Sequence, residues 1–492
     1  MLGNQSTGAR SLECETFHWE GEPPRDEFFW ISQVNKATLL SNKAEGLLTA
    51  QQASDFARAQ REVIAQGNIP GHTRPKMYIH YEPLMVKAAG IEVTLMHAGR
   101  SSQDIHSSFQ RLMMRDRFLR ISQALLDVRK ALLKLCDENK AHVAPCYTNG
   151  VAAQPNNMAH TWLGHAAGYE RDFQQLKELF SRLNLSPMGT TVLNGTSWPL
   201  NRRAMASYLG FDGVVDNAYD AGQISSTDVA LECMLKLVSP MMHVTQFIQD
   251  VMVQYAQPRP WILVTSTYVS SAMPQKRNPG ALIDVRRDAN TVLANLMSVF
   301  TRANNLTPGM YDAKDQKVNC EVLDDAVSVL NDFAHVLGML KVNADRALEE
   351  LNLDWTASQE LADILMRRFD IPFRIGHHFA SDMVTHARIN EFTPLTFPYE
   401  DAQKLYRELV KDEHLEHIPK ELPLSAQEFR AAFDPQEIVC RRQTLGGPQP
   451  SELARQLTQS QERIGSDQDW LNGVQSRLTN AEENLEKEFQ AL

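Results

Sequence analysis

Hydroxyl, amine and amide side chains crowd one ten-residue stretch of this 492-residue chain. Residues 270–279 read Ser-Ser-Ala-Met-Pro-Gln-Lys-Arg-Asn-Pro. A serine hydroxyl stays protonated near neutral pH, so it reacts only where cations or dipoles stabilise its alkoxide. Lys276 stands six residues after Ser270 and can supply such a charge, and Asn278 can donate to an oxyanion or a carboxylate. The stretch therefore predicts a loop with a reactive oxygen beside a cation; the alternative is a surface turn held by its two prolines.

The same stretch resembles the signature loop of the fumarase, aspartase and argininosuccinate lyase superfamily, Gly-Ser-Ser-x-Met-Pro-x-Lys-x-Asn-Pro. Val269 stands where that loop begins with glycine. The resemblance implies a reversible anti β-elimination from a succinyl group, with release of fumarate. It assigns Ser270 as the general base, six residues before Lys276, and leaves Ser271 as the second choice. Lys276 and Asn278 are then expected to stabilise the dianionic aci-carboxylate that forms when the proton leaves.

An earlier segment extends the resemblance to argininosuccinate lyases. Residues 97–104, His-Ala-Gly-Arg-Ser-Ser-Gln-Asp, are similar to the family's His-Thr-Gly-Arg-Ser-Arg-Asn-Asp, in which the serine and the asparagine bind substrate. Ser101 keeps the serine, and Gln103 keeps the amide with one more methylene. Arg100 can hold a substrate carboxylate bidentately, or an acidic partner within the scaffold. The resemblance makes these three residues candidate substrate ligands.

A second segment carries the largest change from the family. Residues 145–155 are similar to Pro-Gly-Tyr-Thr-His-Leu-Gln-x-Ala-Gln-Pro, and Thr148 takes the place of the threonine that binds a substrate carboxylate. Asn149 replaces the histidine that helps to protonate the leaving group. Ile283 replaces the glutamate with which that histidine pairs. We therefore expect Asn149 to contact substrate without serving as the acid.

The resemblance continues into residues that contact substrate further along the chain. Tyr311 and Gln316 match a tyrosine and a glutamine of argininosuccinate lyases, whereas Asn319 replaces a lysine. The catalytic acid stays open at this stage. Its candidates are His97, His106, His160, His165, Tyr147 and Tyr311.

The elements that must position these residues have the apolar spacing of helices. One helix face is predicted by the positions of Phe173, Leu176, Leu179, Phe180 and Leu183. Residues 226–255 predict a helix of about 30 residues, roughly 45 Å long, that Pro240 should kink. Its apolar residues point to several sides, which is typical of a bundle core. Residues 261–264 form a short apolar run that suits a strand or a buried connector, and a polar helix is expected from about residue 467.

Composition and charge exclude several classes of protein. The formal net charge is −11, whereas a broad nucleic-acid surface needs a basic domain or stripe. The six cysteines form no Cys-x-x-Cys pair, so neither a zinc site nor a disulfide framework is predicted. No apolar run reaches the roughly 18 residues of a membrane span, and the polar N-terminus lacks the core of a signal peptide. We expect a cytoplasmic protein with reduced thiols and with neither membrane nor nucleic-acid partners.

The length predicts two or three domains, and the resemblance specifies them. It implies an all-α fold of three domains with a central bundle of long helices, and a homotetramer with a 20-helix core. The expected units are an N-terminal helical domain (1–102), a central helical-bundle domain (103–352) and a C-terminal helical domain (353–492). In the family, the regions of Ser101, Thr148 and Ser270 come from three different subunits. No metal and no cofactor are implied.

The function predicted from these residues is a carbon–nitrogen lyase that releases fumarate from an N-substituted aspartate. The substrate is expected to be a small dicarboxylate or N-succinyl amino acid, argininosuccinate-like or an aminopolycarboxylate of the ethylenediamine-disuccinate type. Changes at Gln103, Asn149, Ile283 and Asn319 favour a compound other than argininosuccinate. The alternatives are a true argininosuccinate lyase, a cycloisomerase resembling carboxymuconate lactonising enzymes, and a non-enzymatic protein on the same scaffold, as in delta crystallins.

Overall fold

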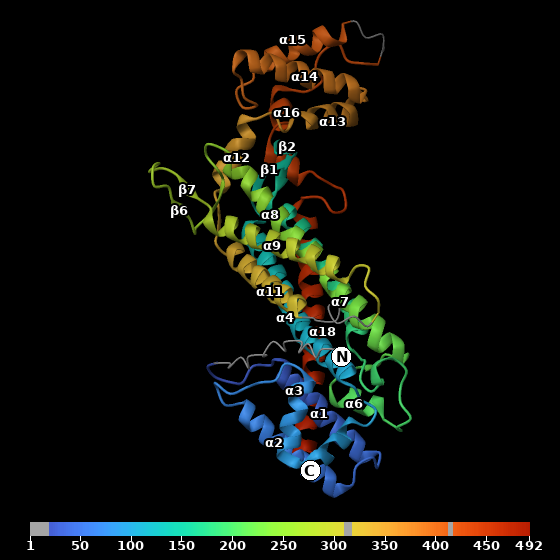
Figure 1. Ribbon diagram of the computed structural model, residues 1–492. Coiled ribbons are helices and arrows are strands. Elements are labelled where there is room, and N and C mark those ends of the chain that lie inside the picture. The colour runs from blue at the N-terminus through green and yellow to red at the C-terminus, as the bar shows by residue number, and fades with distance from the viewer. Residues whose placement is uncertain (1–18, 309–316, 412–416) are drawn as a thin grey trace, which may run out of the picture.

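A bundle of long helices forms the middle of the molecule, with a smaller helical unit at each end (Figure 1). The structure is a computed structural model that describes residues 19–308, 317–411 and 417–492. Strands in these ranges form four two-stranded sheets, and all other regular elements are helices. The prediction of an all-α fold with a central helical bundle is confirmed. The tetramer stays a prediction.

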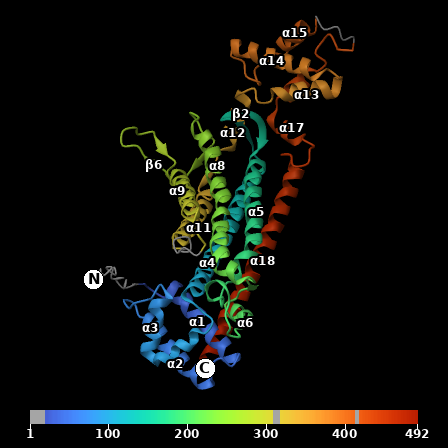
Figure 2. The ribbon, with the colours of Figure 1, turned by 45° about the vertical axis from the view of Figure 1, so that its right-hand side comes forward.

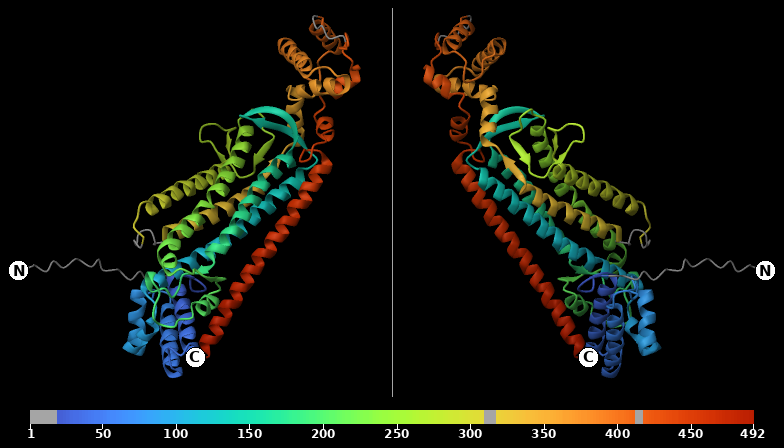
Figure 3. Two further views of the ribbon diagram at one scale, coloured as in Figure 1. Left: turned by 90° about the vertical axis from the view of Figure 1, so that its right-hand side faces the viewer. Right: turned by 90° about the vertical axis from the view of Figure 1, so that its left-hand side faces the viewer.

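Helix α4 is the central element of the bundle. It runs for 38 residues, about 57 Å at 1.5 Å per residue, and buries residues on all its sides. It packs against α11, α5 and α18, and the long helices lie side by side in Figures 2 and 3. The bundle helices are α4 (Ser102–Asn139), α5 (Met158–Leu183), α7 (Ser225–Leu235), α8 (Val238–Tyr255), α9 (Gly280–Ala303), α11 (Lys317–Leu337) and α18 (Pro450–Gln490).

The single kinked helix predicted over 226–255 is wrong. The chain forms two helices instead: one ends at Leu235, and a new one begins at Val238. Pro240 lies in the first turn of α8, where its missing N–H would have no partner within the helix. The proline therefore begins a helix here and does not bend one.

The N-terminal unit lies at the lower end of the bundle in Figure 1. It contains α1 (Glu27–Ala44), α2 (Ala50–Gly67), α3 (Tyr78–Ala89), the 3-10 helix η1 (Ile91–His97) and, from later in the chain, α6 (Arg202–Tyr208). Asp26 caps α1 by accepting the Phe29 N–H, and Arg74 holds the same carboxylate at 2.6 Å. The unit shares one hydrophobic core with the bundle.

The upper end carries a second, separate hydrophobic core built from residues between 357 and 438. Its helices are α13 (Ser358–Phe369), α14 (Phe373–Asn390), α15 (Tyr399–Val410) and α16 (Ala426–Ala431), reached through α12 (Ala344–Leu353) and left through α17 (Pro435–Cys440). Helix α18 then returns along the bundle to the N-terminal unit (Figure 3). It begins at Pro450 and not near residue 467, since Pro450 is a favourable first residue of a helix. Segment 353–492 thus has two parts in space, and the domain boundaries stay a prediction.

The short sheets join loops to the ends of helices. The hairpin of β1 (Val143–Thr148) and β2 (Val151–Asn157) follows α4, and β6 (Tyr268–Val269) pairs with β7 (Arg277–Asn278). The apolar run at 261–264 contains a strand, β5 (Ile262–Val264), which pairs with β8 (Leu340–Val342). The last pair is β3 (Leu185–Ser186) with β4 (Gly213–Val214).

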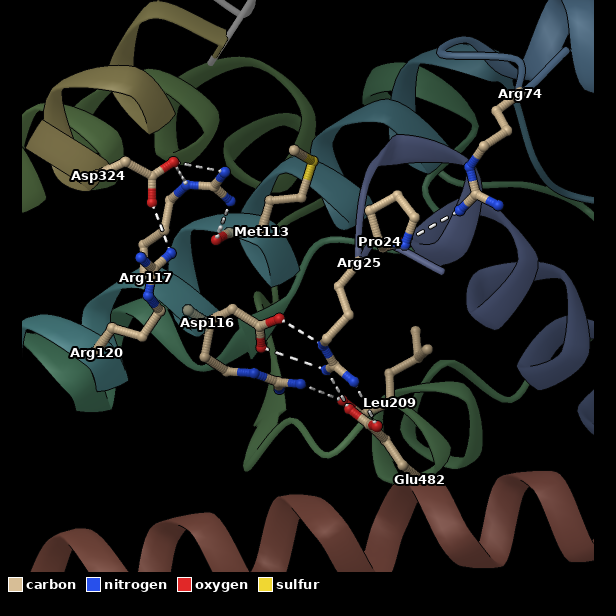
Figure 4. Close-up of polar contacts among 11 residues, drawn as sticks. Pro24, Arg25, Arg74, Met113, Asp116, Arg117, Arg120, Leu209, Asp324 and Glu482 are labelled. Carbon is tan, nitrogen blue, oxygen red and sulfur yellow. Dashed lines mark hydrogen bonds and ion pairs between the residues drawn. The ribbon is translucent and has the colours of Figure 1, made fainter. Parts of the chain in front are cut away.

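Ion pairs connect the N-terminal unit to α4 and α18, and others connect α4 to α11 (Figure 4). Arg25 lies between Asp116 of α4 and Glu482 of α18, at 2.8 and 2.6 Å. Directly after Asp116 on α4, Arg117 and Arg120 both hold Asp324 of α11. These contacts are partly exposed, so each contributes little, and their value lies in fixing the register of the helices. No described helix is long and apolar enough to cross a bilayer.

Candidate active site

The ten-residue motif forms an exposed hairpin loop between β6 and β7, which projects from the side of the bundle (Figure 1). Tyr268 pairs with Asn278, and Val269 pairs with Arg277. Val269, in the place of the family glycine, is 66% exposed and lies in a strand, so its side chain meets no obstacle here. The next residue after the motif, Gly280, begins α9. The hairpin therefore presents the motif to the outside of this chain.

Within the loop, two backbone hydrogen bonds hold the side chain of Ser270. Its Oγ accepts hydrogen bonds from the backbone N–H groups of Ala272 at 3.3 Å and Met273 at 3.1 Å. Two such donors stabilise negative charge on this oxygen, so they favour the alkoxide. Turns that begin with serine show the same geometry, so the bonds also fix the loop. Ser271, the second choice, is exposed.

Thr148 and Asn149 lie at the turn of the β1–β2 hairpin. Thr148 pairs with Val151, and the two residues between them, Asn149 and Gly150, have φ of 54° and 78°. Asparagine and glycine are the residues that tolerate these values, and a two-residue turn of this kind matches the twist of a hairpin. The replacement of the family histidine by asparagine thus suits a tight turn. All four residues are exposed.

The preceding residue, Tyr147, forms hydrogen bonds with residues outside the hairpin. Its hydroxyl donates to the carboxylate of Glu350 on α12 and accepts from the indole N–H of Trp261 at 3.4 Å. Burial and the Glu350 carboxylate raise the pKa of Tyr147 well above its usual value. A tyrosine with a raised pKa that already donates to a carboxylate is a poor proton donor to substrate. The structure therefore favours a supporting role for Tyr147.

The motif at 97–104 forms the N-terminus of α4. Ser101 is the N-cap residue, and its Oγ accepts the N–H of Gln103 at 3.0 Å. Asp104 reaches back to the N–H of Ser101 at 2.7 Å, which completes a capping box. The side-chain nitrogen of Gln103 is buried and has no hydrogen-bond partner among the described residues. Both candidate ligands are thus fixed at a helix N-terminus, where the helix dipole favours an anion.

Asp104 also ties this motif to a strained loop. Its carboxylate accepts five backbone N–H groups, two from its own helix start and three from the loop, those of Gly189, Thr190 and Thr191. In that loop Val192 has φ 78°, which is rare for a β-branched residue. Such strain persists only where surrounding contacts hold it. Sequence analysis gave Asp104 no role, although the Ser-x-x-Asp spacing signals a capping box.

Arg100 lies inside the N-terminal unit. It is 2% exposed, and its guanidinium donates to Asn35 at 2.9 Å, Thr38 at 3.2 Å and Tyr78 at 2.9 Å. Its partners are therefore neutral scaffold oxygens and not the acidic residue that sequence reasoning considered. This placement favours Arg100 as a support for the 97–104 turn.

Two of the three motifs lie far apart in one chain. Ser101 begins α4, and Thr148 follows its opposite end, so the length of that helix, about 57 Å, separates them. Among the described residues, no hydrogen bond or ion pair joins Ser270, Lys276 or Asn278 to either position. A single copy therefore does not assemble the candidate site from these segments.

The candidate histidines are each engaged elsewhere. His97 is stacked on Tyr78, and burial together with Arg100 lowers its pKa. The others contact Phe109 (His106), the backbone oxygen of Gly446 (His160) and the carboxylate of Asp250 (His165). Tyr311 and Gln316 lie outside the described residues. Asn319 accepts a hydrogen bond from Arg302 at 3.2 Å, so the position of the family lysine is used within the bundle.

Comparison with known proteins agrees with this geometry. A model of a lyase family matches residues 43–293. Argininosuccinate lyase of Methanococcus maripaludis is 28% identical over 410 residues, which cover 82% of each chain. The crystal structure of EDDS lyase in complex with formate superimposes with a TM-score of 0.86 at 23% identity, over 94% of this chain and 91% of that one. A 3-carboxy-cis,cis-muconate lactonizing enzyme from Pseudomonas putida has a TM-score of 0.65 at 17% identity, over 90% and 96%.

The family model covers more than half of the chain, and the chain therefore belongs to the lyase family. It is an argininosuccinate lyase-like member of the fumarase/aspartase superfamily, and an enzyme of the carbon–nitrogen lyase type. The resemblance read from the motifs is thus confirmed. The solved structures share the fold.

Proposed function

We propose that this enzyme eliminates fumarate from an N-substituted aspartate whose amine part differs from that of argininosuccinate. Ser270 removes the proton next to one carboxylate, and Lys276 and Asn278 stabilise the dianion that results. Thr148, Ser101 and Gln103 bind the carboxylates and the other polar groups of the substrate. The carbon–nitrogen bond then breaks, and the amine leaves with a proton from another donor or from water.

The observation that carries the proposal is the Ser270 loop. Its two backbone donors point at the oxygen that must become negative, and a lysine and an asparagine follow in the same hairpin. The residues that would protonate the leaving group differ from those of the family. Asn149 replaces the histidine and occupies a turn that suits asparagine, and Ile283, in place of the glutamate, has no ionisable group. An amine that is itself a good leaving group needs little acid help. This combination favours an aminopolycarboxylate over argininosuccinate.

The proposal includes a homotetramer in which one site draws on several subunits. The separation of Ser101 from Thr148 along α4 supports it, since one chain keeps these candidate ligands apart. Arg100 is then a positioning residue for Ser101 and not a substrate ligand. A cytoplasmic location is part of the same proposal.

The test is a screen in both directions. Purified protein is mixed with N-succinyl amines, and fumarate release is followed by ultraviolet absorbance; fumarate with a panel of amines is followed by mass spectrometry. We expect turnover with an aminopolycarboxylate of the ethylenediamine-disuccinate type and much slower turnover with argininosuccinate. Ser270→Ala serves as the blank.

The screen also separates the alternatives. Fast cleavage of argininosuccinate would indicate a true argininosuccinate lyase. Lactone formation from a carboxymuconate without fumarate would indicate a cycloisomerase, to which the fold is also similar. Absence of any fumarate-dependent reaction would contradict the proposal.

A further inference from the structure

A small cavity lies between α4 and α7, along α4 from the motif that begins this helix. Its polar lining consists of Ser107, Gln110 and Arg111 from α4 and Ser225 and Ser226 from the start of α7, and apolar side chains complete the walls. The cavity measures about 20 Å³. This is room for a single species of the size of a water molecule or a small ion.

Arg111 brings a buried positive charge to this cavity. It is 5% exposed, and its guanidinium donates to the backbone oxygens of Leu185 at 2.7 Å and Ser225 at 2.8 Å. No carboxylate of the described residues lies within 4.0 Å of it, whereas the equally buried Arg129 has Asp467 at 2.6 Å. Burial lowers the pKa of Arg111 to about 10, so the side chain keeps its charge at neutral pH. The carboxylates of Asp228 and Asp220 act on it only from beyond 4.0 Å. A buried charge without a directly contacting counter-charge is costly.

Two further polar groups at the cavity have no partner. The hydroxyl of Ser107 and the side-chain oxygen of Gln110 are buried without a hydrogen bond among the described residues, and the two residues are 7% and 5% exposed. Buried polar atoms nearly always have a partner. The hydroxyl can turn its hydrogen into the cavity, and the amide can present its nitrogen in place of its oxygen. The lining thus offers a cation and two neutral donors to one position.

We propose that this cavity binds one small monovalent anion of the size of chloride. Such an ion neutralises the guanidinium and accepts from Ser107 and Gln110, whereas a water molecule would leave the charge uncompensated. Buried charge alone does not define the site, because Arg115 also lacks a carboxylate but is covered by Asn184, the Leu209 oxygen and the Phe211 ring. The bound anion would join α4, which begins at Ser101, to the start of α7.

The experiment measures thermal unfolding of the full chain in sodium chloride, bromide and gluconate at equal ionic strength. Gluconate is too large for the cavity. A ligand that binds only the folded state raises Tm with its concentration, so we expect a higher Tm in both halides than in gluconate. Arg111→Gln should abolish the difference between the salts.

Ser107→Ala is the milder variant, and it keeps the test decisive if Arg111→Gln does not fold. In this variant a higher halide concentration should be needed for the same increase in Tm. Ser108→Ala is the matched control, since Ser108 is buried next to it on α4 but donates to the Asp104 oxygen at 2.7 Å; its halide dependence should remain. A crystal grown in bromide should show an anomalous peak at the cavity. Equal Tm in all three salts would overturn the proposal. So would a crystal in which bromide gives anomalous peaks at other sites but none at the cavity.

Discussion

Tyr147 donates its hydroxyl hydrogen bond to Glu350, and the residue that follows it is the proposed carboxylate ligand Thr148. Glu350 also lies 3.7 Å from Arg346 on the same helix, with both side chains 13% exposed. The turn that carries Thr148 is therefore anchored to α12 through one phenol oxygen. Sequence reasoning could not find this contact, because 203 residues separate its two partners.

Tyr147→Phe should weaken substrate binding without abolishing catalysis. Loss of the hydroxyl leaves Glu350 without its donor and frees the turn, so we expect KM to rise several-fold and kcat to change by less than about tenfold. Tyr255→Phe is the control, because that hydroxyl holds β5 at Val264 and not the turn. A fall in kcat of about 10²–10⁴-fold at constant KM would instead identify Tyr147 as the general acid.

Ser270→Ala should abolish turnover, since it removes the oxygen that is proposed as the general base and that accepts two backbone N–H groups. Circular dichroism and the oligomeric state should not change, because the loop is exposed. Ser271→Ala should keep most activity and is the matched control. Loss of activity in Ser271→Ala alone would move the base to the second serine.

Two inactive variants should restore one another if the site is shared between chains. Thr148→Val and Ser270→Ala are each expected to be inactive. When the two proteins are unfolded together and refolded as a mixture, some sites receive both native residues from different subunits. Recovery of activity in the mixture, compared with each variant refolded alone, is the measurement. A mixture that stays inactive would show that one chain supplies both residues.

Asp467→Asn should lower the free energy of unfolding by about 3–5 kcal/mol. The carboxylate is 3% exposed and holds both Arg129 and Lys177, so its loss leaves the buried Arg129 guanidinium with only the Glu170 carboxylate, at 4.0 Å. Asp324→Asn removes a carboxylate that also holds two arginines but is 36% exposed, and it should cost less than about 1 kcal/mol. Urea unfolding of both variants tests the difference, and equal losses would contradict it.

Gly222→Ala should destabilise the protein by roughly 1–3 kcal/mol or prevent folding. A Cβ at Gly222 would lie 1.8 Å from the backbone oxygen of Val192, in the strained loop that Asp104 holds. Gly164→Ala on α5 is the control, because its Cβ would meet nothing within 4 Å. That change should be neutral or stabilise the helix by up to about 1 kcal/mol. Thermal unfolding compares the two.

The sequence predicted the elements whose information is local. Apolar spacing located α5, and the Ser-Ser-x-Met-Pro pattern located the hairpin of Ser270. The same reasoning misjudged the break before Val238, since a proline in a helical pattern marks either a kink or a first turn. Only the packing against neighbouring helices decides between them.

The site was predictable as a set of residue types and not as an arrangement. Ser101, Thr148 and Ser270 were proposed from short motifs, but the separation of Ser101 from Thr148 depends on the length of α4 between them. The role of Arg100 as a scaffold residue depends on Asn35 and Tyr78, which come from other helices. Such long-range contacts leave no pattern in a single sequence.

Helix α18 has a consequence for the order in which the protein acquires its structure. Synthesis proceeds from the N-terminus, so this helix is made after every other described helix, yet Lys36 of α1 needs its Glu486 and Arg129 needs its Asp467. Phe489 closes the far end of the same core, fully buried. Until α18 is made, the N-terminal unit exposes apolar surface and unpaired cations, which is the state that chaperones bind and that aggregates. The nascent chain is therefore vulnerable until α18 has been made and has packed against these helices.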